Sequence, residues 1–219
     1  IMDLCRGALQ AGLPVLSVST GSYDTANQLN SLNREIPVDD RERAEFITDF
    51  VASSSMLAVG THRVVADAFN TASSVAGNLL LVGRESASLN AMAGRSFTIS
   101  GDVLVDSRDY GVVSSSLQSL DQINAAGGNA EINAFTGGAV TISGSALVTA
   151  DAFAGADDIS RIAGTALGGT AQIRGLGGNV AITGQATVSA RGLGTTTSGI
   201  EAGAEARGGL AQFLATQGG

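Results

Sequence analysis

Apolar and polar residues alternate with a period of two along most of the chain beyond residue 55. In one segment the residues on one side are Ala186, Val188 and Ala190, and those on the other are Gln185, Thr187, Ser189 and Arg191. This alternation is typical of strands that bury one face and expose the other. The side predicted to face inward carries Ala, Val and Ile. The pattern therefore predicts short, half-buried β-strands with a core of small side chains.

Three short elements recur at a spacing of about 41 residues, which indicates a repeat architecture. The first begins at Gly60, Gly101, Gly144 and Gly184; the second covers 97–101, 140–144 and 180–184; the third covers 87–91, 130–134, 171–175 and 211–215. Gly-Gly pairs lie between the strands, and we expect them to supply positive φ in turns. The sequence predicts a mainly β fold, a right-handed β-solenoid of ~41-residue repeats over residues 56–219. An up-and-down barrel is the alternative.

Residues 1–55 follow a different pattern, with only 3 of the 30 glycines and both prolines of the chain, Pro14 and Pro37. Their apolar spacing predicts helices over 4–9 and 24–32, and a third helix that Asp39 or Asp40 caps and that runs to residue 51. A β-branched run predicts a strand over 15–19. We therefore expect a small, incomplete α/β segment, separated from residues 56–219 by a linker at Ser53–Ser55.

Composition excludes several classes of function. The net charge is -8 and the sequence pI is about 4.5, which argues against nucleic-acid binding, because that binding needs a basic face. All 12 cationic residues are Arg, so Lys-dependent Schiff bases and P-loops are excluded. No apolar run is long enough to predict a membrane span. We find no pattern of a signal peptide at the amino terminus.

The candidate chemical residues each have a simpler structural explanation. The one cysteine, Cys5, lies on the apolar face of the first predicted helix, and the one histidine, His62, aligns with Val103, Ala146 and Ala186 at an inward position. Ser53–Ser55 have no Lys or paired His to activate them, and Asp39–Asp40 suit helix capping better than acid–base work. Asp157–Asp158 offer too few ligands for Ca²⁺. We therefore predict no catalytic, cofactor-binding or metal-binding residues, and a protein that is not an enzyme.

Residues 1–55 carry the motifs GLPV at 12–15, TGSYDT at 20–25 and IPVDDRER at 36–43. This stretch resembles the end of the regulatory, DRTGG-type domain of bacterial phosphate acetyltransferase. The resemblance implies a cytoplasmic protein that transfers acetyl groups between CoA and phosphate. It covers about a quarter of the chain and ends near Ser54. Nothing beyond it resembles the catalytic domain, so no catalytic residue is transferred.

Residues 56–219 contain the unit GGNAEINAFTGGAVTISGSALVTADAFAG and related copies. They resemble the β-strand repeats of bacterial autotransporter passengers and adhesins, which implies a cell-surface location. Because the two resemblances imply different compartments and both ends look cut, we expect a chimera or fragment. The function expected is a non-catalytic, adhesin-like display module, with self-association through open solenoid edges. The alternative is a phosphate acetyltransferase-related protein that lacks its catalytic domain.

Overall fold

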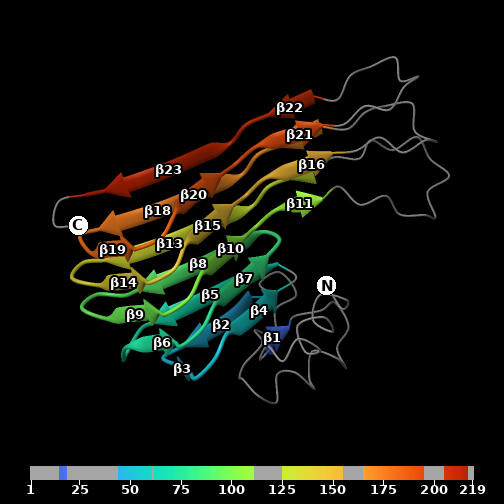
Figure 1. Ribbon diagram of the computed structural model, residues 1–219. Helices are drawn as coiled ribbons and strands as arrows, with labels where there is room; N and C mark the ends of the chain where they lie inside the picture. Colours follow the sequence, from blue (N-terminus) through green and yellow to red (C-terminus); the bar gives the residue numbers. More distant parts are fainter. Residues whose placement is uncertain are drawn as a thin grey trace.

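The computed structural model describes residues 15–18, 44–60, 62–110, 125–154, 165–194 and 205–216. Within these ranges every regular element is a β-strand, and the strands stack into a column (Figure 1). Three large sheets form the sides of this column, and two small sheets extend from one of its corners.

The three large sheets are named face A, face B and face C. Face A contains, in spatial order, β1 (Val15–Val18), β4 (Met56–Gly60), β7 (Leu79–Gly83), β10 (Val103–Asp106), β15 (Ala146–Thr149) and β20 (Ala186–Ser189). Face B contains β2 (Ala44–Thr48), β5 (Arg63–Ala68), β8 (Ser86–Ala91), β13 (Asn129–Phe135), β18 (Thr170–Leu176) and β23 (Leu210–Ala215). Face C contains β3 (Val51–Ala52), β6 (Ser73–Val75), β9 (Ser96–Ile99), β14 (Ala139–Ile142) and β19 (Asn179–Ile182).

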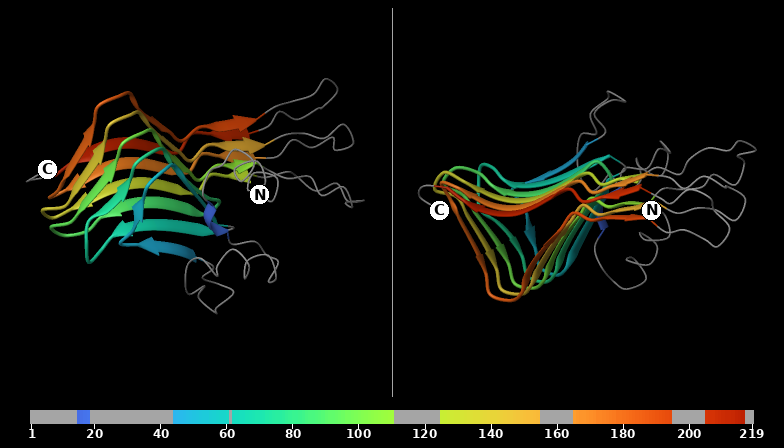
Figure 2. Two further views of the ribbon diagram at one scale, coloured as in Figure 1. Left: turned by 60° about the horizontal axis from the view of Figure 1, so that its bottom comes forward. Right: turned by 90° about the horizontal axis from the view of Figure 1, so that it is seen from above.

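The two small sheets together are named the arm. One contains β11 (Asp109–Tyr110), β16 (Ala152–Ala154) and β21 (Gly192–Gly194), and the other contains β12 (Ala125–Ala126), β17 (Thr165–Leu167) and β22 (Glu205–Arg207). The chain leaves face A along the first sheet of the arm and returns to face B along the second. Figure 2 shows the arm projecting from the corner between faces A and B.

The chain winds repeatedly from face A to face B to face C and back to face A, and each strand pairs in parallel with its equivalent one turn later. Viewed from above in Figure 2, the column has a three-sided outline. These in-register parallel pairings confirm the predicted β-solenoid. The alternative of an up-and-down barrel is wrong, because neighbouring strands in the sequence lie on different faces rather than side by side.

The coils have two lengths. Register partners Met56, Leu79 and Val103 advance by 23 and 24 residues per turn, whereas Val103, Ala146 and Ala186 advance by 43 and 40. The longer coils contain the arm, and the shorter coils pass directly from face A to face B. The predicted period of about 41 residues is therefore confirmed for the coils that carry the arm and wrong for the two short coils before them.

Inward side chains of successive coils stack into apolar columns. One column on face B contains Ile47, Ala66, Leu89, Ile132 and Ile173, all between 0 and 5% exposed. A column on face C contains Val75, Ile99, Ile142 and Ile182. Removal of these side chains from water stabilises the stack, at roughly 25 cal/mol per Å² of apolar surface.

The corner between faces C and A is held by side chains that accept backbone hydrogen bonds from the next coil. The N–H of Asn78 donates to Ser55 Oγ (2.9 Å), that of Asp102 to Asn78 Oδ1 (2.9 Å) and that of Ser145 to Asp102 Oδ1 (2.7 Å). The N–H of Gln185 continues this corner ladder to Ser145 Oγ (3.2 Å). A small polar residue at this corner thus satisfies a backbone donor that the turn leaves unpaired.

The prediction of a helix from Asp39 or Asp40 to residue 51 is wrong. Residues 44–48 and 51–52 form the strands β2 and β3 instead, which pair in parallel with β5 and β6. Phe46, Ile47, Phe50 and Val51 fit a helical face, but pairing with a preformed sheet edge outweighs local helix preference. The strand expected over 15–19 is confirmed as β1, which pairs with β4. The helices expected over 4–9 and 24–32 lie outside the described residues.

Two details of the repeat alignment also change. The strand partner of Gly60 is Gly83, not Gly101, so the first copy of the first element is misaligned. The other two elements align as predicted, on faces C and B. Positive φ occurs at Gly94, Gly137 and Gly177, which confirms the expected turn role for two of the Gly-Gly pairs. In the pairs at 127–128, 168–169 and 208–209, glycine is needed because a side chain would collide with neighbouring backbone. Gly208 is the exception, since a Cβ there would make only ordinary contact, with Ala190 O at 3.8 Å.

Candidate functional site

A polar pocket of about 610 Å³ lies below the first layer of the arm, where the short coils end. Arg84 and Glu85, from the corner between β7 and β8, and His62 line one side, and Asp109 and the 126–128 backbone line the other. Arg84 Nε lies 3.0 Å from Asp109 Oδ1, and the N–H of Ala126 donates to Asp109 Oδ2 over 3.0 Å. His62 Nδ1 lies 2.7 Å from Glu85 Oε1. The pocket therefore presents ionic groups of both signs that already pair with one another.

A second polar cluster supports the base of the arm one coil higher. The carboxylate of Asp151 is 3% exposed and accepts hydrogen bonds from Arg191 Nη2 (2.8 Å), the Arg191 N–H (2.7 Å) and Ser189 Oγ (2.6 Å). Burial acts to raise the pKa of Asp151, but these hydrogen bonds outweigh it and hold that pKa below its usual value. Asp106 and Arg108 form a similar ion pair one coil below. Both pairs lie where a face-A strand passes into the arm.

The outer surface of face B carries a ladder of polar side chains. Asn90 Nδ2 donates to Asp67 Oδ1 (2.7 Å), Asn133 Nδ2 donates to Asn90 Oδ1 (2.8 Å), and Arg174 Nε donates to Asn133 Oδ1 (2.7 Å). Arg174 also pairs with Glu131. Burial raises the pKa of Asp67, and the hydrogen bond from Asn90 and the charge of Arg63 offset only part of this effect. This face-B ladder links four successive coils through side chains as well as backbone.

A shallow hollow of about 570 Å³ lies on the outer surface of face A. Its floor is a row of leucines in register, Leu80, Leu104 and Leu147, and its rim includes Asp102 and Gln185 of the corner ladder. Leu147 is 39% exposed. The hollow combines an apolar floor with a polar rim, on which Asp102 and Ser145 each accept a backbone hydrogen bond of the corner ladder.

A carboxylate at the corner between faces B and C closes the first described turn there. Asp49 has φ of 53°, and its carboxylate accepts the N–H groups of Phe69, Asn70 and Thr71 from the next coil. Burial acts to raise its pKa, but these backbone donors together outweigh that effect and lower the pKa. Asp49 therefore has a structural role in turn formation.

The structure places only some of the candidate residues named from the sequence. His62 lies in a bend with its side chain 44% exposed, so the predicted inward position is wrong; Val103 pairs with Leu79 instead. Ser53 and Ser54 lie exposed in the corner between β3 and β4, and Ser55 takes part in the corner ladder. Cys5, Asp39, Asp40, Asp157 and Asp158 lie outside the described residues.

The paired charges were not predicted from the sequence. Asp151 and Arg191 occupy the same position in successive copies of the first element, as do Asn133 and Arg174 in the third. The signal that could have revealed them is a change from acid or amide to arginine down one aligned column. Arg84 and Asp109 have no such signal, because a short coil and a long coil meet at their position.

Metal-binding groups and membrane-spanning helices are both absent from the described ranges. Within them, no group of three or more His, Cys, Asp and Glu residues is placed to hold a metal ion. No helix suited to crossing a membrane occurs in this part of the chain.

The fold and these surfaces define the chain as a parallel β-solenoid with a lateral arm. A 53-residue segment, 24% of the chain, is 94% identical to phosphate acetyltransferase of Pseudomonas putida. The corresponding identities are 79% over 52 residues for the Pseudomonas aeruginosa enzyme and 45% over 53 residues for the Escherichia coli enzyme. The chain spans only 7 to 8% of the length of these relatives. The expected similarity to phosphate acetyltransferase over about a quarter of the chain is thus confirmed.

No family model matches, and no solved structure matches. Nothing found supports the expected resemblance of residues 56–219 to autotransporter and adhesin repeats.

Proposed function

We propose that this chain is a non-catalytic structural module, in which the β-solenoid is a rigid scaffold that displays its arm to binding partners at a cell surface. The observation that carries the proposal is the in-register stacking of the arm. Its two sheets each repeat over three coils, so the same protrusion is presented three times along one corner.

The arm has the features of a stiff protrusion. Ala125, Ala152, Ala154 and Ala166 form a small core between its two sheets, separate from the main core. Small side chains allow the two sheets to lie close together. The ion pairs of Asp151 and Asp109 brace its base. A rigid display surface reduces the entropy that a partner's binding would otherwise cost.

The short coils show how a control variant without the arm can be designed. In the second of the two short coils, Arg84 and Glu85 alone join Gly83 of face A to Ser86 of face B. The register partners of Ser86 in the later coils are Asn129, Thr170 and Leu210. Replacement of residues 108–128, 151–169 and 191–209 by Arg-Glu would therefore convert the long coils into short ones. The three faces would keep their register.

Binding to bacterial cells and to a panel of immobilised glycans would test the proposal, with fluorescently labelled intact and armless chains compared by cytometry and array. We expect the intact chain to bind at least one of these surfaces and the armless variant to bind at least about tenfold more weakly. Both should show a β-sheet circular dichroism spectrum and cooperative unfolding, since the three large faces are kept. Equal binding by the two chains, or no binding by either, would reject display by the arm.

A second candidate rests on the 94% identity over 53 residues, namely a protein related to phosphate acetyltransferase that transfers acetyl between CoA and phosphate. An assay of CoA release from acetyl-CoA in the presence of phosphate separates the two proposals. The display proposal predicts no turnover above the buffer control. Turnover that stays with the chain through repeated purification would overturn it in favour of the enzyme.

A further inference from the structure

The arm has a sheet edge in the middle of the column, on its side toward the short coils, and this edge is named the lower edge of the arm. β11 and β12 stand first in their sheets because the coil below joins Gly83 to Ser86 through Arg84 and Glu85 alone. Figure 1 shows β11 as the lowest strand of the arm. The polar pocket of about 610 Å³ lies directly against this layer. An edge of this kind can pair with a strand of another chain.

The hydrogen bonds of β12 show which backbone groups face the lower edge. The N–H of Gly127 donates to Leu167 O in the coil above, over 2.9 Å. Successive residues of a strand direct their N–H and C=O groups to opposite sides, so those of Ala126 point to the lower edge. There the N–H of Ala126 donates to Asp109 Oδ2, over 3.0 Å. A side-chain carboxylate therefore occupies a position where the backbone of a further strand would pair.

The chain just before β11 shows the same arrangement. The N–H of Asp109 donates to Asp151 O in the coil above, over 3.1 Å, so the N–H of Arg108 points to the lower edge. Asp106 Oδ1 accepts that N–H over 3.0 Å. Carboxylates of one coil thus satisfy an edge-facing donor on each side of the arm.

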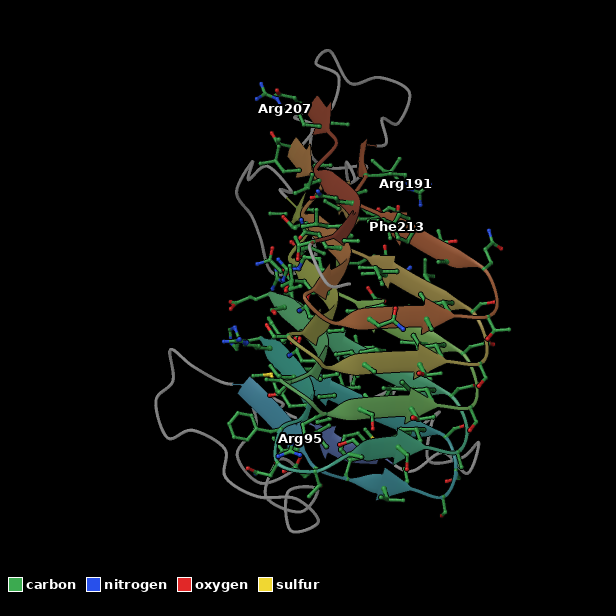
Figure 3. The ribbon with its side chains drawn as sticks, turned by 90° about the vertical axis from the view of Figure 1, so that its left-hand side faces the viewer. Arg95, Arg191, Arg207 and Phe213 are labelled. Carbon is green, nitrogen blue, oxygen red and sulfur yellow. The ribbon has the colours of Figure 1, made fainter. Side chains whose placement is uncertain are left out.

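The acid at the Asp109 position is specific to the arm layer that has no described strand beneath it. Its register partners in the two higher coils carry no polar side chain; they are Ala152 and Gly192. The partners of Ala126 are Leu167 and Arg207, the latter labelled near the top of the stack in Figure 3, and each pairs with a strand one coil below. The lower edge therefore has a carboxylate where the higher layers have a neighbouring strand.

The short coil holds this carboxylate in place. Arg84 Nε lies 3.0 Å from Asp109 Oδ1, and Arg84 Nη2 lies 3.4 Å from Asp109 Oδ2. The side chain of Asp109 is 9% exposed, whereas that of Arg84 is 63% exposed. A charge-assisted pair of this geometry orients the carboxylate toward the Ala126 N–H.

We infer that Asp109 is a protective cap, which keeps β12 from pairing with the β12 edge of a second copy of this chain. An antiparallel hydrogen-bonded pair exchanges two N–H···O bonds between the same two residues. Ala126 directs both its N–H and its C=O to the lower edge, so two copies related by a two-fold axis would satisfy each other at this residue. The cap removes the donor from that exchange. This inference stands independently of the proposed display function.

Asp151 provides a matched control for Asp109. Both are largely buried carboxylates at the base of the arm that pair with an arginine. Asp151, however, accepts the N–H of Arg191 from the next coil, so it lies between two stacked layers. Asp151→Ala therefore removes a similar ion pair without uncovering the lower edge, and Asp109→Ala uncovers it. Asp109→Asn keeps an oxygen that can accept the Ala126 N–H.

Sedimentation velocity on the 219-residue chain at about 10 and about 100 μM would measure the association of these variants. We expect Asp109→Ala to have an association constant at least about tenfold above that of the unmodified chain. Asp151→Ala and Asp109→Asn should match the unmodified chain. The proposal would be overturned by an Asp109→Ala variant that associates no more than the unmodified chain, or by an Asp151→Ala variant that associates as strongly as Asp109→Ala.

Hydrogen exchange of the single Ala126 amide, followed by NMR, tests the cap without any variant. Ala126 is exposed, so its amide should exchange at least about tenfold more slowly than a free amide only if Asp109 holds it. Exchange at the free rate in the unmodified chain would overturn the proposal even if Asp109→Ala failed to fold. In Asp109→Ala, protection of this amide should rise with protein concentration, while that of the β13 amides stays constant.

Discussion

At the scale of single residues, buried carboxylates hold the corners of the column. Asp151 is 3% exposed and Arg191 is 64% exposed, whereas Glu205 and Arg207 form a pair in which both side chains are more than half exposed. We expect Asp151→Asn to lower the free energy of unfolding by about 1–2 kcal/mol, because the amide keeps the shape and loses the charge-assisted bonds. Glu205→Gln, the matched control, should change it by less than about 1 kcal/mol. Urea unfolding at neutral pH measures both.

The pH dependence of the Asp151 effect has a defined sign. The folded state lowers the pKa of Asp151, so the ionised carboxylate stabilises the fold above its unfolded pKa, near 3.9. That stabilisation is lost as pH falls through the lowered value. The difference between the unmodified chain and Asp151→Asn should therefore shrink below about pH 4. A difference that grows on acidification would show that the pairing is misassigned.

Two glycines differ in how closely the neighbouring backbone approaches them. A Cβ on Gly169 would lie far inside contact distance of the Gly127 and Gly128 carbonyl oxygens of the preceding coil, whereas a Cβ on Gly208 would meet only Ala190 O, at 3.8 Å. Gly169→Ala should therefore lower the free energy of unfolding by about 1–3 kcal/mol or more, and Gly208→Ala by less than about 1 kcal/mol. Thermal unfolding of both variants checks this. Equal shifts would contradict the close backbone approach at Gly169.

At the scale of elements, the face-B ladder connects strands that share one register. The structure raises the pKa of Asp67 by burial, so the ionised form is penalised in the folded state at neutral pH. Asp67→Asn keeps an oxygen that can accept the Asn90 hydrogen bond and removes the charge. We expect the variant to be more stable at pH 7, by up to about 1 kcal/mol.

The gain from Asp67→Asn should fade as pH drops through the raised pKa toward the unfolded value near 4, since the native carboxyl is then protonated as well. Unfolding midpoints of both chains at pH 4 and pH 7 test whether the gain in stability is larger at pH 7. Asp102→Asn, at an exposed position whose Oδ1 accepts the N–H of Ser145, serves as the control, with little change at either pH. A destabilised Asp67→Asn at pH 7 would show that the ladder needs the charge.

Elements were predicted correctly where the residue pattern alone determines the face that is buried. Ala130, Ile132 and Ala134 alternate with polar residues and are buried in β13, as in the alternation that predicts half-buried strands. Asn133, at a polar position of the same alternation, is only 2% exposed because Asn90 and Arg174 cover it from the adjacent coils. The pattern of residues 44–48 gave a wrong prediction. Their apolar spacing fits a helix, but these residues form a strand because they pair in parallel with β5.

At the scale of the whole molecule, stability should vary along the column. In a stacked repeat each coil contacts only its neighbours, so an inner coil has two stabilising interfaces, and the coil from β19 to β23 has one within the described residues. We expect amide protection in the order β13, then β18, then β23. Hydrogen exchange on the 219-residue chain measures this gradient. Uniform protection from β13 to β23 would show that the column unfolds as a single unit instead.

The sequence by itself determined the strand character, the solenoid and two of its three aligned elements, because alternation and repetition are local properties of the chain. It also carried the similarity of one quarter of the chain to phosphate acetyltransferase. Only the tertiary structure decided that coils of about 23 and about 41 residues coexist. A two-residue connection from face A to face B and a connection through the arm both leave the strands of the two faces in the same register, so either length fits the stack. It likewise decided that Arg84 meets Asp109 and that Phe213 is exposed. These contacts join residues far apart in sequence, and their geometry exists only once the coils are stacked.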